Sequence, residues 1–288
     1  MKRKLVLQGK HCLMSAIPKK WINQQGLSKG DYVEFEQLEN YLLVSAKPLP
    51  KDKSIKISLK KAERIGIIRL IQMLYDAGFK KIDFDFLDKD ILNYIVEVSE
   101  WFEGSTLSNI KSSSCDLEFY DAEMDFANYF RKVFLNSLEL PVLFSELLSG
   151  KNKIDEINAT VKAVYRGSMV VKRKINTSQL PLEYKYYYFI SIQLEEIADQ
   201  YLFLLKYLKE MKRYPKILLQ LNNKLRDLFK ETYDNFYRFK LDWFIASERG
   251  LIWKWFETEE EPLTVYHLRA ISERIKNIMK YTIGIAYK

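Results

Sequence analysis

The stretch GKHCLMSAIPKKWINQQGLSKGDYVEF, Gly9 to Phe35, differs from the rest of the chain because it is basic and rich in turn residues. Pro18 suits the start of a short helix over residues 19–25, and Gly26 is typical of a left-handed helix cap. About 45 residues of short strands bury too little apolar surface for a core, so we expect this module to pair with a second copy. The alternation of apolar and polar residues predicts strands at 4–7, 13–17, 32–36 and 41–44.

The remainder of the chain changes its apolar period twice. A Pro- and Lys-rich linker, Ala46 to Ser54, follows the module of residues 1–48. Residues 49–120 mix strand and helix periods, which predicts a small α+β connector. Over residues 121–288 apolar side chains recur with a 3–4 spacing, which predicts an all-α antiparallel helical bundle whose first helix kinks or splits at Pro141. The fold class is therefore multidomain α+β.

Composition limits the classes of function. The formal charge of +8 permits an anionic partner such as nucleic acid, although a solvated lysine-rich surface is the alternative. Cys12 and Cys115 form no paired motif, so neither a disulfide scaffold nor a structural zinc site is expected. His11 and His267 are isolated and no glycine-rich phosphate loop is present, so we expect no enzyme. No apolar run reaches the roughly 18 residues of a membrane span, which favours a cytoplasmic protein.

The opening module matches a known family in the order of its motifs. Gly9, the strand that ends at Ile17-Pro18, PKKW, GLSKGDYVEF and YLLV together resemble the swapped-hairpin DNA-binding domain of the AbrB, MazE and SpoVT group. PKKW is similar to the form found in archaeal regulators. The resemblance implies that two chains exchange hairpins into one closed β-barrel, and therefore a homodimer.

DNA is the partner that this resemblance implies. Within residues 1–48, eight basic residues outnumber four acidic ones, and a dimer doubles the excess. Arg3 is the module's only arginine, so bidentate reading of guanine is scarcely available and contacts to the DNA backbone should dominate. Lys10 follows the hairpin glycine, where relatives carry a DNA-contacting basic residue. The alternative is a dimerisation module that touches no DNA. The predicted DNA-binding residues are Lys2, Arg3, Lys4, Lys10, Lys19 and Lys20.

A second resemblance lies in the helical part of the chain. LEYKYYYFISIQLEEIADQY, Leu182 to Tyr201, resembles the PhoU helix that carries a Leu-Glu-Arg-Ile-Ala/Gly-Asp motif, here LEEIAD. SERIKN, at residues 272–277, repeats it in part. This resemblance implies a PhoU-like bundle over residues 121–288, and the order of the three modules resembles archaeal phosphate-uptake regulators.

The same motif suggests a metal site. PhoU relatives bind cations through Glu/Asp-x-x-x-Asp pairs, and Glu195 and Asp199 have this spacing and lie off the apolar stripe, as a surface site requires. They are the predicted ligands of a divalent or ferric ion such as iron, zinc, nickel or manganese. The repeat departs from the pattern, because Glu273 is followed by Asn277. A solvated acidic face is the alternative.

Three functional interpretations follow. The first is a dimeric cytoplasmic DNA-binding transcriptional regulator, linked to phosphate uptake, whose bundle senses phosphate status through a transporter or a metal ion. The second is a PhoU-type adaptor in which the barrel only dimerises and the bundle contacts the phosphate-transporter ATPase. The third is a metal-storing or metal-buffering bundle.

Overall fold

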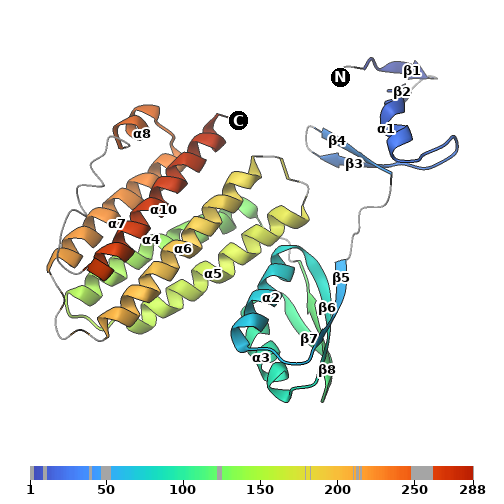
Figure 1. Cartoon of the computed structure of the whole chain (residues 1–288). Coiled ribbons are helices and arrows are strands. Elements are labelled where there is room, and N and C mark those ends of the chain that lie inside the picture. The colour runs from blue at the N-terminus through green and yellow to red at the C-terminus, as the bar shows by residue number, and fades with distance from the viewer. Residues whose placement is uncertain are drawn as a thin grey trace. The chain divides into compact units, whose positions relative to one another are not determined.

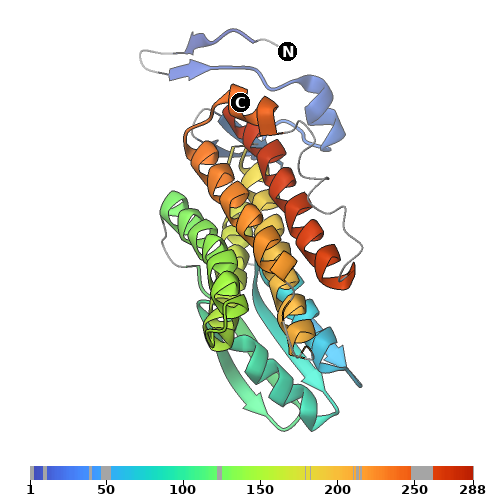
Figure 2. The same ribbon diagram turned by 90° about the vertical axis from the view of Figure 1, so that its left-hand side faces the viewer.

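The structure is a computed structural model with a mixed α+β fold and a helical C-terminal region (Figures 1 and 2). The chain divides into two compact units, Met1–Lys51 and Asp52–Lys288. The prediction of an α+β chain with a helical C-terminal region is confirmed. The structure describes residues 3–8, 12–38, 41–46, 53–121, 125–178, 180–181, 183–209, 211, 214, 216–247 and 262–287.

The first unit consists of two antiparallel hairpins joined by a short helix. Leu7 lies opposite Leu13 in the first hairpin. The helix begins after Pro18, whose φ of −61° fits a helix start, and Gly26 follows its end with a φ of +68°. Each predicted element is present, with strand ends shifted by a few residues. The elements are β1 (Val6–Gln8), β2 (Cys12–Met14), α1 (Lys19–Gln24), β3 (Glu34–Leu38) and β4 (Tyr41–Ser45).

This unit has no buried residue among those whose exposure the structure describes. Its apolar strand side chains face solvent instead: Leu7 is 63% exposed and Leu13 60%, and Phe35 and Leu42 of the second hairpin are also exposed. Apolar surface left in water forgoes the main driving force of folding. The hairpins form two separate two-stranded sheets, and a barrel built with a second chain stays a prediction.

Residues 53–120, here called the lobe, form a four-stranded sheet with two helices on one face (Figure 1). The strand order is β5-β6-β8-β7, with β5 and β6 parallel and the other pairs antiparallel. Along β6, Ile82, Phe84 and Phe86 are buried and alternate with the half-buried Lys81, Asp83 and Asp85, the period expected of a strand covered on one face. The lobe contains β5 (Lys53–Leu59), α2 (Arg64–Asp76), β6 (Phe79–Phe86), α3 (Lys89–Ser99), β7 (Ser105–Lys111) and β8 (Ser114–Phe119).

Residues 125–287, here called the bundle, pack their long helices around one hydrophobic core (Figures 1 and 2). On α5, Ile157, Val161, Val164 and Val171 are buried, as the 3–4 spacing predicts. Helix α6 packs against α5 and α10, and α7 packs against α4 and α10. The helices are α4 (Phe126–Leu148), α5 (Ile154–Thr177), α6 (Tyr184–Leu208), α7 (Lys216–Tyr237), α8 (Leu241–Ser247) and α10 (Pro262–Ala286).

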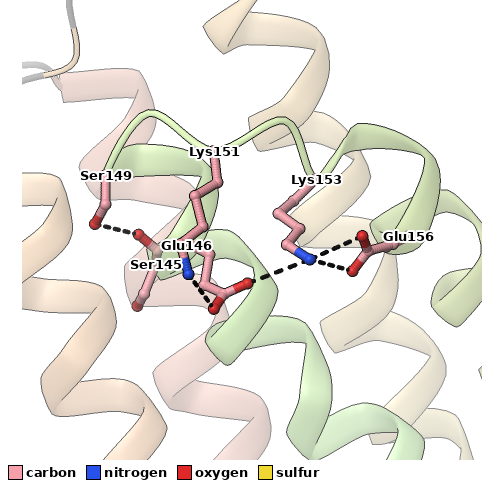
Figure 3. Close-up of polar contacts among 6 residues, drawn as sticks. All are labelled: Ser145, Glu146, Ser149, Lys151, Lys153 and Glu156. Carbon is pink, nitrogen blue, oxygen red and sulfur yellow. Dashed lines mark hydrogen bonds and ion pairs between the residues drawn. The ribbon is translucent and has the colours of Figure 1, made fainter.

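The short connection between α4 and α5 carries a chain of ion pairs (Figure 3). Lys151 Nζ lies 2.8 Å from Glu146 Oε1. Lys153 Nζ lies 3.4 Å from Glu146 Oε2 and 2.6 Å from Glu156 Oε2, so it links the end of α4 to the start of α5. Such partly exposed pairs contribute little stability each, and here they fix the course of a tight turn.

Helix α4 is continuous through Pro141, so the helix is not split there. Leu140, Leu143 and Phe144 are buried around the proline, and Asn222 Nδ2 of α7 donates a hydrogen bond of 2.7 Å to the Pro141 carbonyl. Burial of these side chains outweighs the one backbone hydrogen bond that a proline removes, because helices in proteins are stabilised chiefly by packing.

The lobe and the bundle have separate hydrophobic cores that meet on α5. Met169 of α5 is buried in the core of the lobe, and Tyr165 of the same helix packs against both cores. Helix α2 of the lobe packs directly against α5. The predicted boundary between residues 120 and 121 therefore falls between two cores that lie within one compact unit.

Candidate functional site

The predicted DNA-binding residues fall in two places of the first unit. Arg3 and Lys4 precede β1, and Lys19 and Lys20 form the first turn of α1; all four are exposed. Lys2 and Lys10 lie outside the described residues. Exposed cationic side chains on such a small unit are available to phosphate oxygens without loss of a buried partner.

The predicted metal ligands lie on the side of α6 that faces α5 and the lobe. Glu195 and Asp199 are one helical turn apart on α6, as their spacing predicts. Neither side chain projects freely into solvent: the Glu195 side chain is 13% exposed, and Asp199 accepts a hydrogen bond from the Tyr165 hydroxyl. The burial of this pair is the main difference from the solvent-facing site that the sequence suggests.

Lys172 of α5 is the partner of Glu195, and it also reaches the lobe. Its Nζ lies 2.9 Å from Glu195 Oε1, 3.0 Å from Glu195 Oε2 and 2.9 Å from Asp76 Oδ2, at the last residue of α2. The lysine side chain is 4% exposed and that of Asp76 is 15% exposed. One ammonium therefore joins two carboxylates from two different layers of the molecule, and we call Asp76, Lys172 and Glu195 the junction triad.

Other cationic and polar groups of α5 bind the ends of the lobe helices. Arg173 Nη1 donates to the carbonyl of Tyr75 at 2.7 Å and to that of Phe79 at 2.9 Å, and Asn176 Nδ2 donates to the Asp76 carbonyl at 2.6 Å. Arg166 Nη2 donates to the Glu100 carbonyl, just after α3, at 2.9 Å. The last carbonyls of a helix lack partners within it and carry partial negative charge, so cations of α5 are well matched to them.

The charges of the junction triad shift each other's protonation equilibria. Burial raises the pKa of Glu195 from an ordinary 4.5 to about 7, although the Lys172 ammonium acts in the opposite direction. Burial also raises the pKa of Asp76, again against the effect of Lys172. For Lys172, burial lowers the pKa, but the two carboxylates outweigh it and the net direction is upward. Lys172 is thus held as an ammonium between two carboxyl groups that compete for it.

Tyr165 adds a further group to this cluster. Burial raises the pKa of its hydroxyl, and the hydrogen bond to Asp199 raises it further, so the phenol remains a donor to the carboxylate. Since Tyr165 also packs against both hydrophobic cores, the polar cluster and the apolar junction are continuous.

These residues do not fit a metal ion in the present arrangement. The Lys172 ammonium lies where a cation bound to Glu195 would have to lie, and Asp199 is turned to Tyr165. Among the residues that the structure describes, no three His, Cys, Asp or Glu side chains are grouped as metal ligands. The chemistry at this place is that of a buried ion pair with an excess of carboxylate.

The second copy of the motif lies beside the first. Gln193 Oε1 of α6 accepts a hydrogen bond of 2.9 Å from Asn277 Nδ2 of α10, and Arg274 Nε lies 3.0 Å from Glu196 Oε2. Glu273 pairs with Lys276 of its own helix at 3.2 Å. The polar contacts between α6 and α10 at this place therefore come from Glu196 of the first motif, from Gln193 just before it, and from Arg274 and Asn277 of the second.

The partners of Glu195 were not predicted as site residues. Asp76 lies in another layer, more than a hundred residues earlier in the chain, and no local pattern links the two. Lys172 and Arg173 also lack a local signal, because they follow Val171 in the chain and lie off the apolar stripe of α5; their burial is a result of tertiary packing.

Comparison of the chain with models of protein families, with curated proteins and with solved structures finds no match. The resemblances to the AbrB and PhoU groups therefore rest on the sequence motifs. None of the helices in the described part of the chain is long and apolar enough to cross a membrane.

Proposed function

We propose that the protein is a cytoplasmic DNA-binding transcriptional regulator linked to phosphate uptake, and that it dimerises through its first unit. The observation that carries the proposal is the state of that unit. It exposes its apolar strand residues, has no buried residue among those whose exposure is described, and carries twice as many basic as acidic residues in positions 1–48.

The exposed apolar residues support dimerisation. Leu7 and Leu13 face each other across the β1–β2 hairpin, and Phe35 and Leu42 are exposed in the β3–β4 hairpin. A two-stranded hairpin is marginal in water by itself and needs further strands or another apolar surface. A second copy of the same unit supplies both in a closed symmetric assembly.

The distribution of charge supports DNA as the partner. Arg3, Lys4, Lys19 and Lys20 are exposed, and a dimer carries each of them twice. Lysines bind phosphate as point charges and do not read base edges bidentately, so binding depends strongly on salt and weakly on sequence.

The link to phosphate uptake is supported by the bundle. Its two PhoU-like motifs, LEEIAD on α6 and SERIKN on α10, lie on adjacent helices and are joined by the Glu196–Arg274 ion pair, and Asn277 of the second motif bonds to Gln193, the residue before the first. An internal repeat whose copies pack on each other is the arrangement expected of a bundle built from duplicated helical units.

Salt-titrated DNA binding tests the proposal. The full-length chain is titrated with a duplex carrying the sequence upstream of its own gene, together with the double variant Lys19→Gln/Lys20→Gln. A plot of log affinity against log salt concentration has a negative slope. Loss of two phosphate contacts per protomer makes this slope less steep, by about 3–4 in a dimer. The matched control is Lys60→Gln/Lys61→Gln, an exposed lysine pair of the lobe, which should bind as the wild type does. Absence of binding at low salt by a dimeric wild type would favour the adaptor interpretation.

A further inference from the structure

The junction triad is the most deeply buried group of charges that the described residues form between the lobe and the bundle. Lys172 on α5, Asp76 on α2 and Glu195 on α6 meet within 2.9 to 3.0 Å. They come from three different helices, one of the lobe and two of the bundle.

The balance of charge at the triad is unusual for a stable buried site. Two carboxylates share one ammonium, and Asp76 Oδ1 is buried with no hydrogen-bond partner among the residues that the structure describes. Removing charged groups from water is costly and is offset only when each has a close partner. Loss of Lys172 would therefore leave two carboxylates facing each other without this counter-charge. The interface therefore needs the positive charge of this lysine and not only its volume.

The surrounding contacts show what the lysine holds. Helix α2 ends at Asp76, and its last carbonyls are bound by Arg173 and Asn176 of α5. Arg173 also stacks over the Tyr75 ring at 4.6 Å and pairs with Asp121 at 2.7 Å. The C-terminal end of α2 is thus fixed to α5 by polar contacts, of which the triad is the part that also engages α6.

We infer that Lys172 is a resident counter-cation that clamps the end of α2 onto the bundle and closes the Glu195 carboxylate to metal ions. The lysine does at this position what a bound cation would do, which is to bring carboxylates from separate helices to one centre. It does so without depending on metal supply, because the charge is part of the chain. This inference does not depend on DNA binding or on dimerisation.

Hydrogen–deuterium exchange of the full-length chain tests the clamp. Asp76→Ala removes the lobe's carboxylate and leaves Lys172 with Glu195 as a one-to-one pair, so the bundle keeps its own contact. We expect exchange over residues 70–77, the last turns of α2 and the residue that follows it, to become at least about tenfold faster, with α7 unchanged as an internal reference. The local effects of the substitution act in the opposite direction. Alanine favours helix, and removing an acidic group near a helix C-terminus is favourable, so these effects alone would slow exchange there.

The matched control for this experiment is Asp83→Ala. Asp83 lies in the same lobe and pairs with Lys81 at 3.1 Å, but its side chain alternates away from the sheet face that α2 covers. Exchange over residues 70–77 should remain as in the wild type. Equal exchange in the Asp76→Ala and Asp83→Ala variants would overturn the clamp.

Thermal unfolding with and without Mn²⁺ tests the exclusion of metal. The unfolding midpoint of the wild type should be the same with and without Mn²⁺. The Lys172→Met variant, which leaves the two carboxylates without their ammonium, should unfold about 10 °C below the wild type. Arg274→Met, which breaks the half-exposed pair with Glu196, should lower the midpoint far less. A wild-type midpoint that rises with Mn²⁺, and no longer rises in Glu195→Gln, would overturn the inference. That comparison decides the matter even if Lys172→Met does not fold.

Discussion

Glu195 shows how one residue's surroundings change its chemistry. It lies in a position whose spacing with Asp199 is that of a cation site, yet its nearest charges are Lys172, Asp76 and Asp199, with Arg173 bound to the adjacent lobe helix. Because its carboxyl group is buried, and because Asp76 and Asp199 repel its negative charge, Glu195 binds a proton near neutral pH far more readily than a free carboxyl group does.

A pH dependence of stability follows from this residue. The pKa of Glu195 is raised to about 7 in the folded protein against an ordinary 4.5, so its contribution is fully present below pH 4.5 and is lost as the pH rises through 7. Between pH 6 and pH 8 the free energy of unfolding should fall by about 1 kcal/mol on account of Glu195. Urea denaturation across this range measures the fall.

The comparison of two glutamine variants assigns that effect. Glu195→Gln should remove the fall, while Glu196→Gln, one residue away on the side of α6 that faces α10, should retain it. A Glu195→Gln variant that loses stability with pH as steeply as the wild type would refute the assignment. The Lys172 contribution is constant over this range, because its raised pKa lies above 10.5.

At the scale of elements, the position of α5 depends on its close approach to α4 as well as on its apolar stripe. A Cβ atom on Gly167 would lie 2.5 Å from Cγ2 of Val133 in α4, closer than packed carbon atoms can come. Both positions are buried, so α4 cannot easily move away. Glycine here sets the spacing of two helices.

Gly167→Ala should therefore destabilise the protein. Alanine gains about 1 kcal/mol of helix propensity, but overpacking a tight core costs about 1–3 kcal/mol, so we expect a net loss of about 1 kcal/mol in unfolding free energy. Gly66→Ala in α2 is the matched control, because its Cβ would meet nothing within 4 Å, and it should stabilise the protein. Chemical denaturation distinguishes the two signs, and stabilisation by both variants would contradict the close approach.

The sequence predicts these elements well where periodicity is strong and less well where a distant element intervenes. The 3–4 spacing correctly predicts α5, α6, α7 and α10. A split of α4 at Pro141 is absent, because side chains on both sides of the proline are buried. The candidate site follows the same division. The spacing of Glu195 and Asp199 by one helical turn is a local property, and the sequence predicts it. Lys172 and Asp76 reach Glu195 only through tertiary packing.

At the scale of the whole molecule, the two units differ in how much apolar surface they bury. Its apolar strand residues are exposed in the single chain, while both hydrophobic cores of the described residues lie in the second unit. The proposed function needs two copies, because the described residues of a single unit include no buried side chain and its basic surface is small.

Disruption of the first hairpin should therefore dissociate the protein. We expect the wild type to have twice the 34.3 kDa mass of the chain in light scattering, and Leu7→Glu/Leu13→Glu to approach the mass of one chain. Leu87→Glu changes a leucine of the lobe that is 79% exposed and should leave the mass unchanged. A wild type with the mass of one chain would contradict the proposed assembly.

Met169 has a consequence for synthesis on the ribosome. The lobe's own strands and helices end by residue 119, but its core includes this methionine, some fifty residues further along the chain. Translation proceeds at about 5–20 residues per second, so the nascent lobe waits several seconds for the segment that completes it. During that interval the apolar surface of the incomplete lobe is accessible to chaperones. Synthesis of α5, which packs against both the lobe and the bundle, ends this exposure.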